Sequence, residues 1–230
     1  MTYERSVQER KRIAAEAAAE LVEDGMRVGL GTGSTVAPLL PALARRDGLQ
    51  GVRYVATSVA TAQKARSLGL AVEEFDSVDA LDSLDLAIDG ADQIDPGWWV
   101  IKGGGGAHTR EKVVAAAAAR FVVIGTEEKL VSALTPPVPL ELLRFGLAAT
   151  LRRLESAEIR PGTPLSPDSG VIADYRGSFE DPAALSDLLG ATPGVVDHGL
   201  FPPSMVHGVI IGTDGGPESP TRSDALRKSA

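Results

Sequence analysis

The chain has 230 residues, 43% of them hydrophobic and 23% charged, a composition typical of a globular protein that excludes a collagen, a coiled coil and general disorder. Its 23 Lys and Arg residues against 31 Asp and Glu residues give a net charge of −8, which disfavours nonspecific binding to nucleic acids or membrane surfaces. It contains no cysteine, which excludes disulfides, thiol catalysis and cysteine-ligated metals.

No targeting segment is evident in the sequence. Residues 1–13 are highly charged and lack the apolar core of a signal peptide. No run of about 18 apolar residues is present, so no transmembrane helix is expected. We therefore predict a cytoplasmic protein that binds neither nucleic acid nor membrane.

Short apolar strands alternate with helices through the first part of the chain. We expect a helix over 7–24, a strand over 26–30, a helix over 36–46, a strand over 52–56, a helix from 57 to about 68, strands over 70–74 and 84–88, a helix over 109–119 and a strand over 121–124. Strands that alternate with helices predict an α/β fold, with a parallel sheet and crossover helices.

Prolines punctuate the second part of the chain, at 135–139 and at positions 161, 164 and 167. We expect a smaller α/β domain over 135–204, and an apolar strand over 206–212 that returns to the first sheet. The large domain then comprises 1–134 and 205–230. Residues 215–230 are polar without an apolar period, and we expect them to form a flexible tail.

A glycine-rich motif, Gly-Leu-Gly-Thr-Gly-Ser-Thr at 29–35, lies between a predicted strand and a predicted helix. Glycines let the backbone approach a ligand closely, and amides at the start of the helix point at an anion. A dinucleotide-binding fingerprint needs glycine at Ser34, and a Walker loop needs lysine where Gly33 stands. The motif therefore fits a single phosphate, although a turn with Ser34 or Thr35 capping the helix explains it equally well.

A pair of aspartates, Asp89 and Asp92, follows the strand predicted over 84–88. Open α/β sheets bind ligands at this end of their strands. The carboxylates can hold sugar hydroxyls, shift one another's protonation or bind a metal, whereas a turn with an Asx hydrogen bond is the structural alternative. The spacing matches no calcium loop and the 3 histidines show no metal-ligand spacing, so we expect no metal.

Four consecutive glycines, at 103–106, follow Lys102 and precede the helix predicted over 109–119. A flexible linker is the usual explanation for such a run. Between a strand and a helix, a loop whose amides face a ligand explains it better. Lys102 offers a cation beside this loop. Glu111, near the start of the helix, is either a partner of the helix dipole or a general base.

Four segments together resemble ribose-5-phosphate isomerase, type A, in order and spacing: 31–35, 57–61, 89–92 and 102–112. The likeness is close over roughly the first 130 residues and continues more loosely through 139–141 and 194–201. It implies a Rossmann-like parallel-sheet domain with a second, smaller α/β domain inserted before the last strand. It also implies interconversion of ribose 5-phosphate and ribulose 5-phosphate in the non-oxidative pentose phosphate pathway. The resemblance implies no metal and no organic cofactor. It also implies that the protein forms a homodimer or homotetramer.

The resemblance also implies roles for residues. Glu111 would be the proton-shuttling base, and Asp89, Asp92 and Lys102 would contact the sugar end of the substrate. Lys11 and Lys129 would add cations near the phosphate. The substrate-binding residues implied in this way are Lys11, Thr32, Gly33, Ser34, Thr35, Asp89, Gly90, Ala91, Asp92, Lys102, Gly103, Gly104, Gly105 and Lys129.

The chain departs from the family pattern at three places: Gln93 replaces an acid, Thr126–Glu128 differ before Lys129, and Pro167–Val171 replaces an Asn-rich stretch. These departures bear on oligomer contacts and fine substrate choice. One alternative function is an isomerase or deaminase for another phosphosugar. The other is a noncatalytic sugar-phosphate sensor, but such a sensor is normally fused to a DNA-binding unit and would not need Glu111 beside Lys102.

Overall fold

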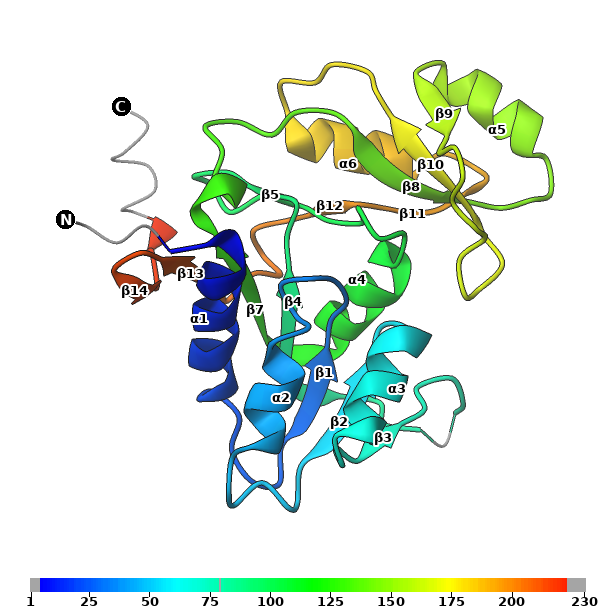
Figure 1. Ribbon diagram of the computed structural model, residues 1–230. Helices are drawn as coiled ribbons and strands as arrows, with labels where there is room; N and C mark the ends of the chain where they lie inside the picture. Colours follow the sequence, from blue (N-terminus) through cyan, green and yellow to red (C-terminus); the bar gives the residue numbers. More distant parts are fainter. Residues whose placement is uncertain (1–4, 79, 223–230) are drawn as a thin grey trace.

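The computed structural model describes residues 5–78 and 80–222. Its largest sheet has seven strands in the order β14-β13-β7-β4-β1-β2-β3 (Figure 1). The strands are β1 (Arg27–Leu30), β2 (Arg53–Ala56), β3 (Val72–Glu73), β4 (Leu84–Gly90), β7 (Ala118–Thr126), β13 (Gly208–Thr213) and β14 (Gly216–Glu218). All neighbouring pairs are parallel except β13 and β14, so the expected parallel sheet is present.

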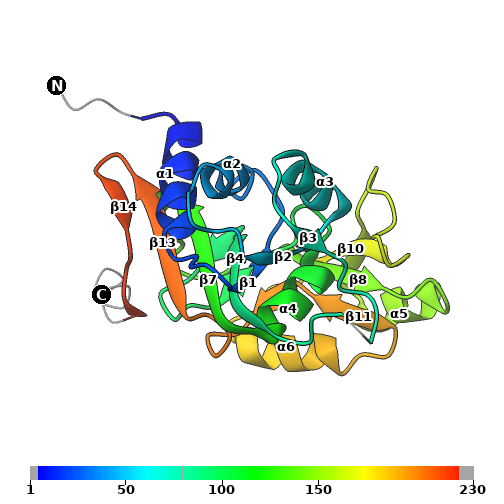
Figure 2. The same cartoon turned by 90° about the horizontal axis from the view of Figure 1, so that it is seen from below.

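Helices cover both faces of this sheet: α1 (Val7–Ala19), α2 (Leu39–Ala44) and α3 (Val59–Ser67) on one face and α4 (His108–Ala117) on the other (Figure 2). Side chains alternate between the two faces of a strand. Leu86 and Ile88 of β4 accordingly pack in the core beneath α1 and α2, whereas Ala87 packs in the core that includes Val114 of α4. Within the described residues, no helix is both long and apolar enough to cross a membrane.

A smaller antiparallel sheet lies within the segment predicted as the second domain, in the order β11-β8-β10-β9. Its strands are β8 (Val138–Leu142), β9 (Ala157–Ile159), β10 (Val171–Tyr175) and β11 (Val195–His198), with helices α5 (Leu147–Leu154) and α6 (Pro182–Gly190) beside them. A third sheet, β12-β6-β5, was not expected. It pairs β12 (Leu200–Phe201) with β6 (Val100–Ile101), which also pairs with β5 (Gln93–Ile94), and so joins the segment predicted as the second domain to the rest of the chain.

Two helices are shorter than their apolar pattern predicted. The helix expected over 7–24 ends at Ala19, after which a turn leads to Gly25 in a left-handed conformation. The helix expected over 36–46 begins only at Leu39, because residues 33–38 form turns that start at Gly33 with φ 115°.

The expectation of a flexible tail over 215–230 was wrong at its start. Gly216–Glu218 forms β14 and pairs antiparallel with β13, placing Gly216 opposite Thr213 and Glu218 opposite Ile211. The hydroxyl of Thr213 holds the turn by donating to the Gly216 carbonyl at 2.9 Å. Strand pairing at a sheet edge does not require the apolar period whose absence suggested a tail. Residues 223–230 lie outside the described chain.

Close packing of α1 against β13 generates a first prediction. A Cβ atom on Gly212 would overlap the carbonyl oxygen of Arg10 and lie 2.7 Å from its carbon. On Gly208 of the same strand, a Cβ would meet only Val122, at 3.6 Å. Gly212→Ala should therefore lower the free energy of unfolding by about 1–3 kcal/mol, measured by urea denaturation. Gly208→Ala, the matched control, should change it by less than about 0.5 kcal/mol. Equal stabilities would contradict this packing of α1.

Candidate active site

A cavity of about 300 Å³ opens where β1 and β4 end, beside the start of α4. It lies at the carboxyl ends of parallel strands, where open α/β sheets bind ligands. The residues that line it are Lys11, Thr32, Gly33, Ser34, Thr35, Gly90, Ala91, Asp92, Lys102, Gly103, Gly104, Gly105, Glu111 and Lys129. Every site residue singled out from the sequence lines this cavity except Asp89.

Lys102 lies between two carboxylates in the protein interior. Its Nζ is 2.9 Å from Asp89 Oδ2 and 3.1 Å from Glu111 Oε2, and it donates a hydrogen bond to the Gly90 carbonyl at 2.7 Å. These three charged side chains are only 3%, 5% and 6% exposed. Burial alone would lower the pKa of Lys102, but the two negative charges outweigh it and raise this pKa to about 12. Lys102 is therefore a fixed cation at neutral pH.

Glu111 has the opposite character, because it titrates near neutrality. Burial raises its pKa and the nearby charge of Asp89 raises it further, against the opposing effect of Lys102, to about 7. Glu111 Oε2 contacts the ammonium of Lys102 and has no other polar partner among the described residues. A buried carboxyl with this pKa can both take and give a proton at neutral pH.

Asp89 lies behind the cavity wall. Its Oδ1 accepts hydrogen bonds from the backbone amides of Gly90 at 2.7 Å and Thr32 at 3.1 Å, while its Oδ2 contacts Lys102. Gly31 is required here, because a Cβ at that position would overlap the Asp89 carboxylate. Asp89 thus joins the loop after β1 to the end of β4 and holds Lys102 in place.

The glycine loop, residues 103–106, is held to the cavity by Asp92, whose Oδ2 accepts a hydrogen bond from the Gly104 amide at 2.7 Å. Gly103 has φ 106°, and a Cβ there would lie 2.7 Å from His108 and 2.8 Å from Pro139. The glycine at this position therefore meets two demands at once, a left-handed conformation and close packing.

Cations and hydroxyls gather at the loop after β1. Lys11 of α1 reaches across to donate a hydrogen bond to Ser34 Oγ at 2.8 Å, and Lys129, in the short 3-10 helix Glu127–Lys129 after β7, also lines the cavity. Neither Ser34 nor Thr35 caps a helix, because α2 begins after Pro38 and has no side-chain cap. The capping explanation of this motif is therefore wrong, and its hydroxyls are left facing the cavity.

Hydroxyl side chains of residues 57–61 contact the loop after β1 on the side away from the cavity. Thr57 and Thr32 hydroxyls lie 2.7 Å apart, and Thr61 donates to the Gly31 carbonyl at 3.1 Å. Ser58 caps α3 by accepting a hydrogen bond from the Thr61 amide. Thr57, Ser58 and Thr61 do not line the cavity at the ends of β1 and β4, so this motif supports the loop and caps α3 instead of facing a ligand.

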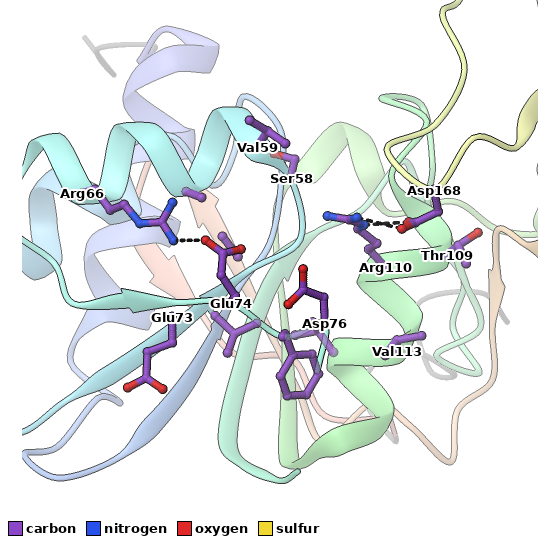
Figure 3. A pocket seen from close by; sticks show the side chains of 15 residues that line it. Ser58, Val59, Arg66, Glu73, Glu74, Asp76, Thr109, Arg110, Val113 and Asp168 are labelled. Atoms are coloured by element: carbon purple, nitrogen blue, oxygen red, sulfur yellow. Dashed lines mark hydrogen bonds and ion pairs between the residues drawn. The ribbon is translucent and has the colours of Figure 1, made fainter. Parts of the chain in front are cut away.

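A second cavity, of about 450 Å³, lies between α3 and α4 (Figure 3). Both of its arginines are already paired, Arg66 with Glu74 at 2.5 Å and Arg110 with Asp168 at 2.6 Å. Among the residues that the structure describes, no group of three or more His, Cys, Asp or Glu side chains could hold a metal. The smaller cavity combines loop hydroxyls, lysines and a titratable carboxyl, and is the better candidate for catalysis.

Sequence reasoning missed Arg160, which contacts the glycine loop from the small domain. It lies 57 residues from Gly103 in an irregular segment after β9, and no local pattern indicates such a contact.

The chain is similar to known proteins of one enzyme family. The family model of ribose 5-phosphate isomerase A (phosphoriboisomerase A) matches residues 53–216. Ribose-5-phosphate isomerase A of Caulobacter vibrioides is 47% identical over 227 residues, covering 92% of this chain and 97% of the relative. The structure of ribose 5-phosphate isomerase A from Neisseria gonorrhoeae matches with TM-score 0.87 and 32% identity, over 94% of this chain and 98% of that one. A D-ribose-5-phosphate isomerase in complex with phospho-erythronic acid matches with TM-score 0.86 and 33% identity, over 94% and 99% of the two chains.

The charges around Glu111 generate a second prediction. In ¹³C NMR of protein labelled at glutamate carboxyls, the Glu111 signal should titrate with a midpoint near pH 7, neutral below and charged above it. Asp89→Asn removes the charge that raises this pKa, so the midpoint should move to lower pH. The signal is assigned by its loss in Glu111→Gln, and exposed Glu158→Gln serves as the control. An unshifted midpoint in Asp89→Asn would refute the coupling between the two carboxyls.

Proposed function

Because the chain belongs to the ribose 5-phosphate isomerase A family, and so interconverts ribose 5-phosphate and ribulose 5-phosphate in the pentose phosphate pathway, we propose that Glu111 is its catalytic base. The observation that supports this role most directly is the burial of Glu111 beside a fixed cation, with its pKa raised to about 7. A noncatalytic sensor of phosphosugars would not need such a carboxyl.

The reaction moves a carbonyl group from C1 to C2, and one carboxyl group suffices for both proton transfers. Glu111 removes the proton from C2 of the open-chain aldose, and the electrons of that C–H bond form the C1=C2 bond of an enediol. The protonated carboxyl then returns a proton to C1, while C2 becomes the carbonyl carbon and a hydroxyl proton passes from O2 to O1. A pKa near the working pH makes both steps accessible.

Negative charge develops on the sugar oxygens as the C2 proton leaves. Lys102 carries a fixed positive charge at this place, and the glycine loop offers backbone amides. Such preorganised charges and donors lower the barrier because they need no rearrangement during the reaction. Asp92 lines the same wall and can accept a hydrogen bond from a sugar hydroxyl. Asp89 does not contact the substrate in this proposal, and it acts by holding Lys102 and the amide of Thr32 in place.

The phosphate group binds at the loop after β1. Residues 32–35 supply amides and hydroxyls, and Lys11 and Lys129 supply positive charge. Because the phosphate is remote from C1 and C2, its contacts provide binding energy that orients the reacting carbons.

We further propose that the enzyme needs no metal or organic cofactor, since its own carboxyl and ammonium groups provide the acid, base and charge. A homodimer or homotetramer is supported by apolar side chains left exposed on the small domain, among them Phe145 at 93% and Leu143 at 50%. A cytoplasmic location is supported by the substrate, a doubly charged phosphosugar that a membrane retains inside the cell.

The role of Glu111 gives a third prediction. Glu111→Gln keeps the shape of the side chain but removes the base, so kcat should fall by about 10²–10⁴-fold while ribose 5-phosphate still binds. Exposed Glu158→Gln should retain the wild-type kcat. With the wild-type enzyme in D₂O, some deuterium should appear at C1 of ribulose 5-phosphate, because a carboxyl proton exchanges with solvent. An active Gln variant together with no deuterium at C1 would assign the base to another residue.

The phosphate loop gives a fourth prediction. Lys11→Ala removes one charge from the phosphate site, and if that contact is equally strong in the ground and transition states, KM should rise with little change in kcat. Arg12→Ala removes a charge from the next, solvent-facing position of α1 and should leave KM unchanged. Ribose without phosphate should be a far poorer substrate in the same assay. Equal kcat/KM for ribose and its 5-phosphate would overturn this assignment.

A further inference from the structure

Arg160 links the small domain to the glycine loop of the active site through four hydrogen bonds. Its Nε and Nη2 donate to the two oxygens of Asp174, at 3.0 and 2.6 Å, and its Nη1 donates to the carbonyls of Gly103 and Gly104, both at 3.0 Å. Arg160 is 17% exposed and Asp174 7%. We propose that Arg160 is a positioning residue that turns the peptide groups of the glycine loop toward the reacting end of the sugar, an inference that rests on the proposed function.

Because the peptide bond is planar, holding a carbonyl group also fixes the direction of the amide in the same peptide group. In a trans peptide, the carbonyl of one residue and the amide of the next point in opposite directions. The Gly103 carbonyl points to Arg160, and the Gly104 amide accordingly points the other way and donates to Asp92. The Gly104 carbonyl points to the same Arg160 nitrogen, so the Gly105 amide is directed to the side of Asp92, which is the side of the cavity that Gly105 lines.

A run of glycines needs such an anchor. Without side chains, each peptide plane in the run can rotate at little cost, and a rotated plane would turn a carbonyl oxygen toward the developing negative charge. Asp92 fixes the Gly103–Gly104 peptide group from the cavity side, and the Gly106 amide also donates to the Gly103 carbonyl at 3.0 Å. Arg160 fixes that group and the next one from the opposite side.

The geometry of a guanidinium group suits this position. One edge of the fork pairs with both oxygens of Asp174, which balances the charge and leaves Nη1 for the two carbonyls. A lysine offers its donors from a single nitrogen and cannot hold Asp174 and both carbonyls in this arrangement.

Attachment of the small domain does not depend on Arg160 alone. Lys112 of α4 bonds Asp197 of β11 at 2.5 Å, Arg110 pairs with Asp168, and β12 pairs with β6. What Arg160 adds to these contacts is the orientation of the loop, so its loss should affect the chemical step more than the fold.

The test compares Arg160→Met, which keeps much of the side-chain volume, with Arg176→Met. Arg176 forms an exposed ion pair with Glu158 in the same sheet and is the matched control. Three quantities are measured: kcat with ribose 5-phosphate, the inhibition constant of phospho-erythronic acid, whose carboxylate carries charge like that of the enediolate, and the inhibition constant of inorganic phosphate. Circular dichroism checks that each variant is folded.

Arg160→Met should lower kcat by about 10²-fold, the order expected when reacting groups are misplaced by about 1 Å. Its inhibition constant for phospho-erythronic acid should rise by a similar factor, while that for inorganic phosphate stays the same, because phosphate binds at the loop after β1. Arg160→Lys, which retains the positive charge, should show the same pattern to a smaller degree and serves if the Met variant does not fold.

An unchanged kcat in a folded Arg160 variant would overturn the inference. So would a rise in the inhibition constant of inorganic phosphate equal to that of phospho-erythronic acid, because that result would indicate general damage to the site. Failure of the proposed function is distinguishable, since the Glu111→Gln variant would then retain the kcat of the wild-type enzyme, whatever the result at Arg160.

Discussion

Lys102 lies in the interior with Asp89 at 2.9 Å and Glu111 at 3.1 Å, and this contact decides the properties of the site. If all three groups were charged, two negative charges would face one positive charge in a medium that solvates ions poorly. The excess charge is relieved when one carboxyl binds a proton, and burial accordingly raises the pKa of both Asp89 and Glu111, that of Glu111 to about 7. Removing one partner from such a buried pair typically costs about 3–5 kcal/mol, so the residues proposed for catalysis also contribute to stability.

A short hairpin between β4 and Lys102 brings these residues together. Asp89 lies at the end of β4, and the hairpin of β5 and β6 then carries the chain out and back, so that the Asp92 amide bonds the Ile101 carbonyl at 2.8 Å. Lys102 follows at once and returns to the end of β4, where it bonds Gly90. The glycine loop turns the chain into α4, whose first turn presents Glu111. Each side chain proposed for catalysis is therefore held by a strand end or a helix start rather than by a long loop.

Much of this site could be predicted from the sequence, because the motifs follow strands of one parallel sheet and the ends of such strands meet. The position of Asp89 behind the wall could not, since it depends on the absence of a side chain at Gly31, a contact between separate strands. The pairing of β14 was missed because edge strands are stabilised by backbone hydrogen bonds, which leave little trace in side-chain pattern. Arg160 was missed because its partners, Gly103 and Gly104, lie 57 and 56 residues away in the sequence, where no local pattern indicates the contact.

The third sheet has a consequence for how this protein could evolve. Its strand β12 comes from the end of the small domain, and the backbone there is joined directly to the site, with the Lys102 amide bonding the Gly199 carbonyl at 2.9 Å and the Gly199 amide bonding the Pro139 carbonyl at 2.7 Å. A recombination event that exchanged residues 135–204 for an unrelated segment would remove β12, the strand that pairs with β6 next to Lys102. Residues 135–204 therefore cannot be exchanged as a unit without replacing this strand of the third sheet.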